Sequence, residues 1–154
     1  MSILLVLSKM RLIMKKWLCF EKYLFLFFIG GSAYYCLEIV MRGFSHYSMF
    51  FCGGFCFIGC GMLNESVNIE MSLISQMVLS SLLITVLELI TGCIVNLWLG
   101  WHIWDYSRLP YNFKGQICLS YSVRWFFLSL AAIVGDDYLR YLFFDEEKPY
   151  YKIL

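Results

Sequence analysis

The sequence has 154 residues, of which 61% are hydrophobic and 15% are charged, and its formal net charge is +1. This composition lies outside the range of soluble globular domains, and the near-neutral charge argues against a nucleic-acid-binding protein. Seven cysteines, an odd number, are spread through apolar stretches and do not form a disulfide framework. We therefore predict one all-α domain of the cell membrane: a four-helix transmembrane bundle with an N-terminal amphipathic lead-in.

The first segment, residues 1–22, combines a short apolar run with five basic residues that follow it. The run is too short to cross a bilayer, which takes about 20 residues. A secretory signal places its basic residues first, so this order argues against a cleaved signal peptide. We predict a basic amphipathic lead-in at the membrane surface, then a transmembrane domain over residues 23–144 and a charged cytoplasmic tail over residues 145–154.

Apolar stretches predict spans at residues 23–41, at residues 47–63, from residue 71 onward, and at residues 117–134. The second stretch is uncharged and rich in small residues. Helices in lipid pack closely where small residues meet, so we expect this helix at the centre of the bundle. Cys52, Gly53, Cys56 and Cys60 form its predicted packing face. A metal site would need thiolates with suitably spaced His or carboxylate partners, and we predict neither a metal nor a cofactor.

The third span carries Glu88 as its only charge before a Trp-rich segment. Residues 71–101 would reach about 46 Å as one helix, more than the roughly 30 Å hydrocarbon core. The helix therefore tilts, bends near Gly92 or leaves the core by about Asn96, and the tryptophans favour the last. In the fourth span we expect Gly135 to end the helix, with Asp136 and the next aspartate capping a short surface helix over residues 138–144.

Ionisable side chains inside the spans suggest a polar network in the outer half of the bundle. Glu88 lies about 16 Å and Arg124 about 10 Å from the outer ends of their helices, so we predict an ion pair between them. Glu38 and Arg42 are one helical turn apart and can pair locally. The network either lines an outward-opening polar pocket or fixes the fold. Its predicted members are Glu38, Arg42, His46, Glu88, Asn96, Asp105 and Arg124.

Enzymatic motifs are missing from the sequence. His46, His102 and Asp105 could meet near the outer surface to act on lipid head groups, but no H-E-x-x-H spacing accompanies them. There is no Walker A motif for ATP hydrolysis and no Gly-x-Ser-x-Gly motif of a hydrolase. We predict no catalytic residues and a protein that is not an enzyme.

Basic residues predict the orientation of the bundle. The lead-in has five, and Arg140, Lys148 and Lys152 follow the last span, whereas the opposite side holds Arg42, Arg108 and Lys114. The side richer in Lys and Arg is cytoplasmic in most membrane proteins. With four spans, both termini are therefore expected in the cytoplasm.

Several motifs also occur in a characteristic order: EIVMRGFSHYSM at residues 38–49, NE at 64–65, ELITG at 88–92 with Asn96, WDYS at 104–107, GQIC at 115–118 and Trp125. Over residues 25–145 this order resembles the CmpB-like family, a putative ABC-transporter permease family (type IV) grouped with a eukaryotic transmembrane protein family. The resemblance implies a permease-type subunit, a separate ATP-binding subunit and a homo-oligomer, because typical ABC permease domains have more spans and a coupling helix. The alternative is a non-transporting membrane scaffold or regulatory protein.

Overall fold

The computed structural model describes residues 2–66 and 71–153, with side chains for residues 17–63 and 71–153. This part of the chain contains four α-helices, one π-helical segment and one two-stranded antiparallel hairpin. The elements in chain order are α1 (Ser2–Arg42), α2 (Tyr47–Ser66), α3 (Leu73–Gly92), η1 (Cys93–Trp98), β1 (Asn112–Phe113), β2 (Ile117–Cys118) and α4 (Leu119–Phe144).

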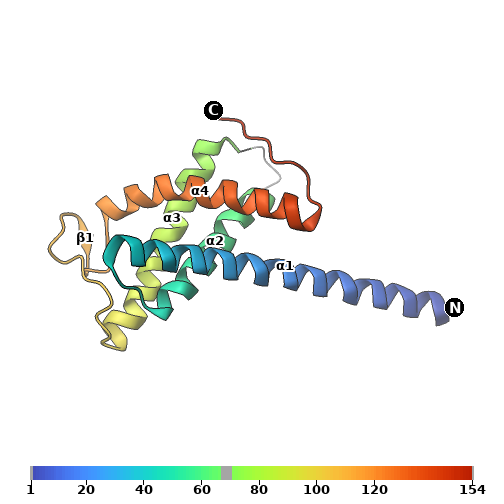
Figure 1. The fold of residues 1–154 in the computed structure, drawn as a ribbon, viewed down its shortest axis with the longest axis horizontal. Helices are drawn as coiled ribbons and strands as arrows, with labels where there is room; N and C mark the ends of the chain where they lie inside the picture. The colour runs from blue at the N-terminus through green and yellow to red at the C-terminus, as the bar shows by residue number, and fades with distance from the viewer. Residues whose placement is uncertain (1, 67–70, 154) are drawn as a thin grey trace.

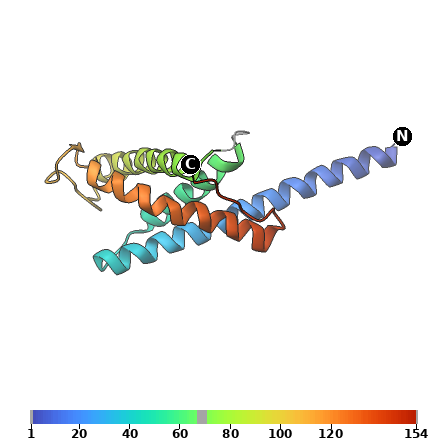
Figure 2. The same ribbon diagram turned by 90° about the horizontal axis from the view of Figure 1, so that it is seen from above.

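The helices cross one another rather than lying parallel. In Figure 1, α1 and α4 run side by side across the view, and α2 and α3 cross them obliquely. The hairpin lies at one end of this arrangement (Figure 2), and the C-terminal tail returns from the far end of α4 to the start of α3 (Figure 1). The loop from η1 to α4, residues 99–118, therefore covers one end of the bundle, and we call it the end loop.

Helix α1 joins the predicted lead-in and the first span in one continuous helix of 41 residues. At 1.5 Å per residue this helix is about 60 Å long, twice the thickness of a hydrocarbon core. Its N-terminal end projects beyond the other helices (Figure 1). The helix ends at Arg42, and the next residue, Gly43, has a φ of +80° that favours glycine.

Helix α2 lies at the centre, as the small residues predicted, because it contacts α1, α3 and α4. Gly53 packs against Tyr34 of α1, and Cys60 forms a buried cluster with Met77 of α3 and Ile133 of α4. A second cluster, at the end-loop end, joins Met49, Val95 and Trp104. The core thus consists of two small clusters at different levels of the bundle.

Helix α3 begins at Ser72, whose hydroxyl caps the helix by accepting a hydrogen bond from the Ser75 amide. After Gly92 the helix widens into the π-helical segment η1, which ends at Trp98. The following Gly100 has a φ of +67°, which lets the chain reverse direction. This helical part of the chain therefore ends at Trp98, and the exit from the hydrocarbon core near Asn96 stays a prediction.

Helix α4 corrects the prediction for the fourth span. Gly135 does not end the helix, which continues without a break from Leu119 to Phe144. Asp136 is not a cap either, because its carboxylate is fully buried and pairs with Arg140 one turn later. An added Cβ on Gly61 of α2 would lie 1.9 Å from Asp136, so this glycine admits the carboxylate against the α2 backbone. The sequence suggested a boundary because Gly and Asp also favour helix ends.

The C-terminal tail folds back onto the bundle. The carbonyl of Lys152 accepts a hydrogen bond from the Leu73 amide at 2.7 Å, and the Tyr151 hydroxyl donates to Asp137 at 2.9 Å. Lys22 of α1 pairs with Glu146 at 2.6 Å. Burial and the Asp137 charge raise the pKa of Tyr151, so its hydroxyl remains a donor. The predicted charged tail is therefore an ordered part of the fold over its described residues.

The distribution of side chains is inverted relative to a soluble bundle. Large apolar residues face outward on all four helices, and buried positions include charged and polar residues. Residues 17–42 and 73–98 form helices long and apolar enough to cross a membrane, and residues 47–63 form a shorter apolar helix. The outward apolar residues include Phe28, Phe55, Val86 and Phe127, and the buried polar ones Gln76, Glu88, Ser129 and Asp136.

Candidate functional site

A partly open cavity of about 190 Å³ is lined by residues of all four helices. Its lining is almost entirely apolar, and Glu88 is the one charged residue among the lining residues. The small side chains of α2 leave this space open, because thiols and glycine do not fill the gap between larger neighbours. The polar and aromatic members of the lining are Tyr34 from α1, the three thiols of α2, Glu88 from α3 and Trp125 from α4.

Neutral donors hold the carboxylate of Glu88. One oxygen accepts a hydrogen bond from the Tyr106 hydroxyl at 3.0 Å, and the other accepts one from the Trp125 indole N–H at 2.8 Å. Only 3% of the Glu88 surface is exposed. Burial, followed by the charge of Glu88, raises the pKa of Tyr106 above its ordinary value. The Tyr106 hydroxyl therefore stays protonated and keeps donating to the carboxylate.

The predicted ion pair between Glu88 and Arg124 is wrong. Arg124 is exposed, and its guanidinium lies 4.5 Å from the centre of the Tyr121 ring. Glu88 and this part of α4 do lie at the same level, because Trp125 contacts Glu88. The rotation of α4 about its axis, however, turns Trp125 inward and Arg124 outward.

Asn96 fastens the end loop to η1. Its side-chain amide donates to the Trp104 carbonyl at 3.1 Å and to Gln116 at 2.9 Å, and its side-chain oxygen accepts from the Ile103 amide at 2.7 Å. The Trp104 indole donates to the Gln116 carbonyl at 2.9 Å. Gly92 makes room for this layer, because an added Cβ would lie 2.6 Å from the Gln116 side-chain oxygen. Asn96 is thus a structural clamp beside the cavity.

The predicted local pair of Glu38 and Arg42 is confirmed, with 2.8 Å between the guanidinium and the carboxylate. Glu38 also accepts from the Ser45 hydroxyl at 2.6 Å, and Arg42 donates to the Ile103 carbonyl at 2.8 Å. These contacts tie the end of α1 to the end loop. Neither residue belongs to the cavity lining.

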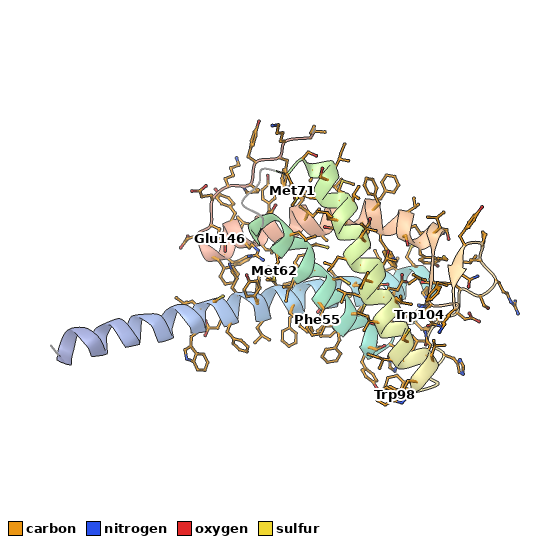
Figure 3. All side chains as sticks on the ribbon, turned by 180° about the vertical axis from the view of Figure 1, so that it is seen from behind. Phe55, Met62, Met71, Trp98, Trp104 and Glu146 are labelled. Carbon is orange, nitrogen blue, oxygen red and sulfur yellow. The ribbon has the colours of Figure 1, made fainter. Side chains whose placement is uncertain are left out.

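His46 and Asp105 serve local turns at the same end of the bundle. His46 contacts the Ser48 hydroxyl at 2.9 Å and packs on the Trp101 ring, with 5.2 Å between ring centres. Asp105 accepts from the backbone amide and hydroxyl of Ser107, and these bonds lower the pKa of its exposed carboxyl. In Figure 3, Trp98 marks the tip of η1, and Trp104 lies on the side of the hairpin.

Six of the seven residues predicted for the polar network lie outside the lining of the cavity, and Glu88 lies within it. The six hold turns, clamp the end loop or face outward. The cavity is also less polar than the predicted outward-opening pocket. Sequence reasoning missed three cavity or carboxylate partners, Tyr34, Tyr106 and Trp125, and the clamp residue Gln116. Tyr106, Gln116 and Trp125 could have been found from the sequence, because all three belong to the motifs WDYS, GQIC and Trp125 that mark the family resemblance.

The predicted packing face of α2 has a second role. Cys52 and Cys60 are buried, Cys56 is half-buried, and with Gly53 they all line the cavity. Within the described side chains, no group of three His, Cys, Asp or Glu residues is arranged to hold a metal ion. The thiols therefore shape the cavity, and the statement that the protein is not an enzyme stays a prediction.

Comparison with models of protein families shows the family to which the chain belongs. The family model ABC_trans_CmpB, described as "Putative ABC-transporter type IV", matches residues 24–143. The chain belongs to the CmpB family. The match includes the cavity, the end loop and all of α2, α3 and η1. Comparison with curated proteins and with solved structures finds no match. The family match and the two long apolar helices together indicate a membrane protein related to ABC transporters.

Proposed function

We propose that this CmpB-family protein is a multi-pass, permease-type subunit of an ABC transport system. In this proposal all four helices cross the membrane, and the cavity beside Glu88 receives the substrate. The observation that carries the proposal is the cavity itself, because residues of four helices and one carboxylate line it. Ionisable groups inside membrane bundles commonly mark substrate or ion pathways.

Four spans are supported by the apolar outer surfaces of α2 and α4, which resemble those of the two longer apolar helices. Phe51 and Phe55 face outward from α2, and Phe127 and Leu142 face outward from α4. The charged residues Asp136 and Arg140 of α4 are turned inward and paired. Such an arrangement suits a helix surrounded by lipid, where charges pair within the bundle.

Energy for transport would come from a separate subunit, since the sequence has no Walker A motif. The test is purification of the tagged full-length chain in mild detergent from cells that produce it at native level. We expect a nucleotide-binding subunit with a Walker A motif to elute in fixed ratio with the chain, together with ATP hydrolysis. A matched purification of an unrelated tagged membrane protein controls for carry-over. A chain that elutes alone or without ATPase activity would overturn the permease proposal.

A homo-oligomer would give the small chain a larger pore-forming unit. Cross-linking in intact membranes, followed by mass measurement of the purified complex, would reveal the number of copies. A monomer bound to an ATP-binding subunit would contradict this part of the proposal alone.

A second candidate is a non-transporting scaffold or regulator of other membrane proteins. It is favoured by the side chains of Arg42 and Asn96, which bind backbone groups of the end loop and lie outside the largely apolar lining of the cavity. This candidate predicts a stable membrane partner in the same purification, without ATP hydrolysis.

A further inference from the structure

Resting on the proposed function, the geometry points to a ligand class for the cavity: we propose that it binds a lipophilic organic ammonium ion. The positive head group lies against the carboxylate of Glu88, and the apolar body of the ion fills the space between the helices. Three independent features carry this inference, namely the missing counter-ion, the aromatic walls and the size of the cavity.

The counter-ion of Glu88 is missing from the described part of the chain. Both hydrogen bonds to its carboxylate come from neutral groups. Arg124 faces outward, Arg42 pairs with Glu38, and Arg140 pairs with Asp136. A buried charge is costly unless an opposite charge accompanies it. A cationic ligand would supply that charge.

Aromatic rings stand beside the carboxylate. Tyr34 and Trp125 both line the cavity, with 6.0 Å between their ring centres and an angle of 58° between the rings. Trp125 donates its N–H to Glu88, and its ring also lies 6.0 Å from that of Tyr121, while the part of Trp125 that lines the cavity remains open to a ligand. Faces of Trp and Tyr rings attract ammonium ions, and aromatic cages recognise methylated ammonium groups. A carboxylate with two adjacent rings thus favours an organic ammonium over a strongly hydrated metal ion.

The size of the cavity limits the apolar body of the ligand. Its volume is about 190 Å³, whereas an engineered apolar cavity of about 150 Å³ accommodates benzene. The remaining lining is apolar and includes Leu37, Ile84 and Leu128. One carboxylate and one ring-sized space therefore suit a monovalent ion that carries one aryl or short alkyl group.

The probe is phenyltrimethylammonium, and its neutral isostere is tert-butylbenzene. We expect saturable binding of the cation to the purified full-length protein in detergent, measured by equilibrium dialysis. The neutral isostere should compete weakly, because it gains nothing from the carboxylate. Equal competition by the isostere, or the absence of saturable binding of the cation, would overturn the proposal.

Variants locate the bound ion. Glu88→Gln should weaken binding by more than roughly tenfold, because the charged partner in a buried pair is lost, while Glu147→Gln at an exposed position should leave it unchanged. Ala132→Leu should exclude the ion by filling the cavity without altering the carboxylate. Circular dichroism and gel filtration check each variant for folding. If Glu88→Gln fails to fold, unchanged binding by Ala132→Leu still overturns the proposal.

Failure here can be told apart from failure of the permease proposal. Binding is measured on the chain alone, whereas the permease proposal depends on an associated ATPase. An ATPase partner without binding of the cation would leave a permease for another substrate. Binding without a partner would leave a ligand-binding membrane protein.

Discussion

At the scale of single residues, Glu88 determines how the bundle interior is organised. The acid sits in the most apolar stretch of the chain, and two motif residues far from it in sequence, Tyr106 and Trp125, supply its hydrogen bonds. A carboxylate inside a bundle is unfavourable unless such partners are present. The donors therefore link α3, the end loop and α4 through one side chain.

Replacing Tyr106 with phenylalanine should destabilise the bundle. The change removes one donor to a buried carboxylate, so we expect the free energy of unfolding to fall by about 1–3 kcal/mol. Reversible unfolding in mixed micelles, followed by circular dichroism, measures the loss. Tyr121→Phe is the matched control, because the two tyrosine rings stack with 4.3 Å between their centres and no hydrogen bond of the Tyr121 hydroxyl is found in the described part of the chain. Equal losses in the two variants would contradict the role of the hydroxyl.

The same comparison has a pH dependence. The pKa of Tyr106 is raised in the folded protein, so its contribution is fully present below the ordinary tyrosine pKa of about 10 and is lost as the pH rises above it. The stability difference between wild type and Tyr106→Phe should therefore stay constant from neutral pH to about 10 and shrink at higher pH. A difference that grows with alkaline pH would contradict the direction of this shift.

At the scale of elements, Asn96 joins the widened end of α3 to the end loop. A π-helical segment turns its side chains differently from an α-helix and often occurs at functional sites. Here it directs Asn96 toward three partners in the loop, and only 4% of the Asn96 surface is exposed. The loop includes residues with positive φ, among them His102 and Tyr111, so external bonds are needed to hold its shape.

Asn96→Ala should release the end loop while the helices remain formed. Each group that loses its partner in the buried layer costs about 1–3 kcal/mol, and the loop amides should exchange faster as a result. Hydrogen exchange read by mass spectrometry over residues 101–116 measures the effect. Leu97→Ala, on the exposed side of the same turn, is the control and should leave exchange in the loop unchanged. If the loop amides of the Asn96→Ala variant still exchanged slowly, contacts other than those of Asn96 would stabilise the loop.

Helix α4 contains the ion pair that interrupts its apolar pattern. Asp136→Ala would leave the charge of Arg140 buried without its nearest partner, at a cost of about 3–5 kcal/mol. The double variant that also carries Arg140→Ala should recover part of this stability, since it removes both charges. Unfolding of both variants is compared with that of Glu147→Ala, whose side chain is exposed. A double variant less stable than Asp136→Ala would indicate that Arg140 acts mainly through other contacts.

The sequence predicted the positions of the helices better than the side-chain contacts between them. Hydropathy and small residues located the four helices and the central place of α2, because these depend on local composition. They did not predict that residues 1–22 continue into the first span or that α4 continues past Gly135. The Glu38–Arg42 pair was predictable for the same reason, since four-residue spacing fixes it. The partner of Glu88 was not, because a one-residue difference in helix rotation decides whether Arg124 or Trp125 faces inward. The hairpin and the tail contacts depend on tertiary packing, which no short pattern encodes.

At the scale of the whole molecule, the two ends of the bundle differ in character. The end-loop end is closed by hydrogen bonds to backbone groups and carries exposed aromatic residues, including Trp98, Trp101 and Tyr111. The opposite end holds the ion pairs Asp136–Arg140 and Lys22–Glu146 and the docked tail. In Figure 3, Glu146 lies at this second end, far from Trp98. Aromatic residues are typical of membrane–water interfaces.

The basic residues predict that the end loop lies outside and that both termini lie in the cytoplasm. One epitope tag inserted after Pro110, at an exposed position of the end loop, and another at the C-terminus test it. Antibodies applied to intact cells should detect the loop tag, whereas the C-terminal tag should require permeabilised cells. If α4 lay on the membrane surface, both tags would react on the same side, and the four-span proposal would fail. The reversed pattern would keep four spans but invert the bundle, which would place the end loop beside the ATP-binding subunit.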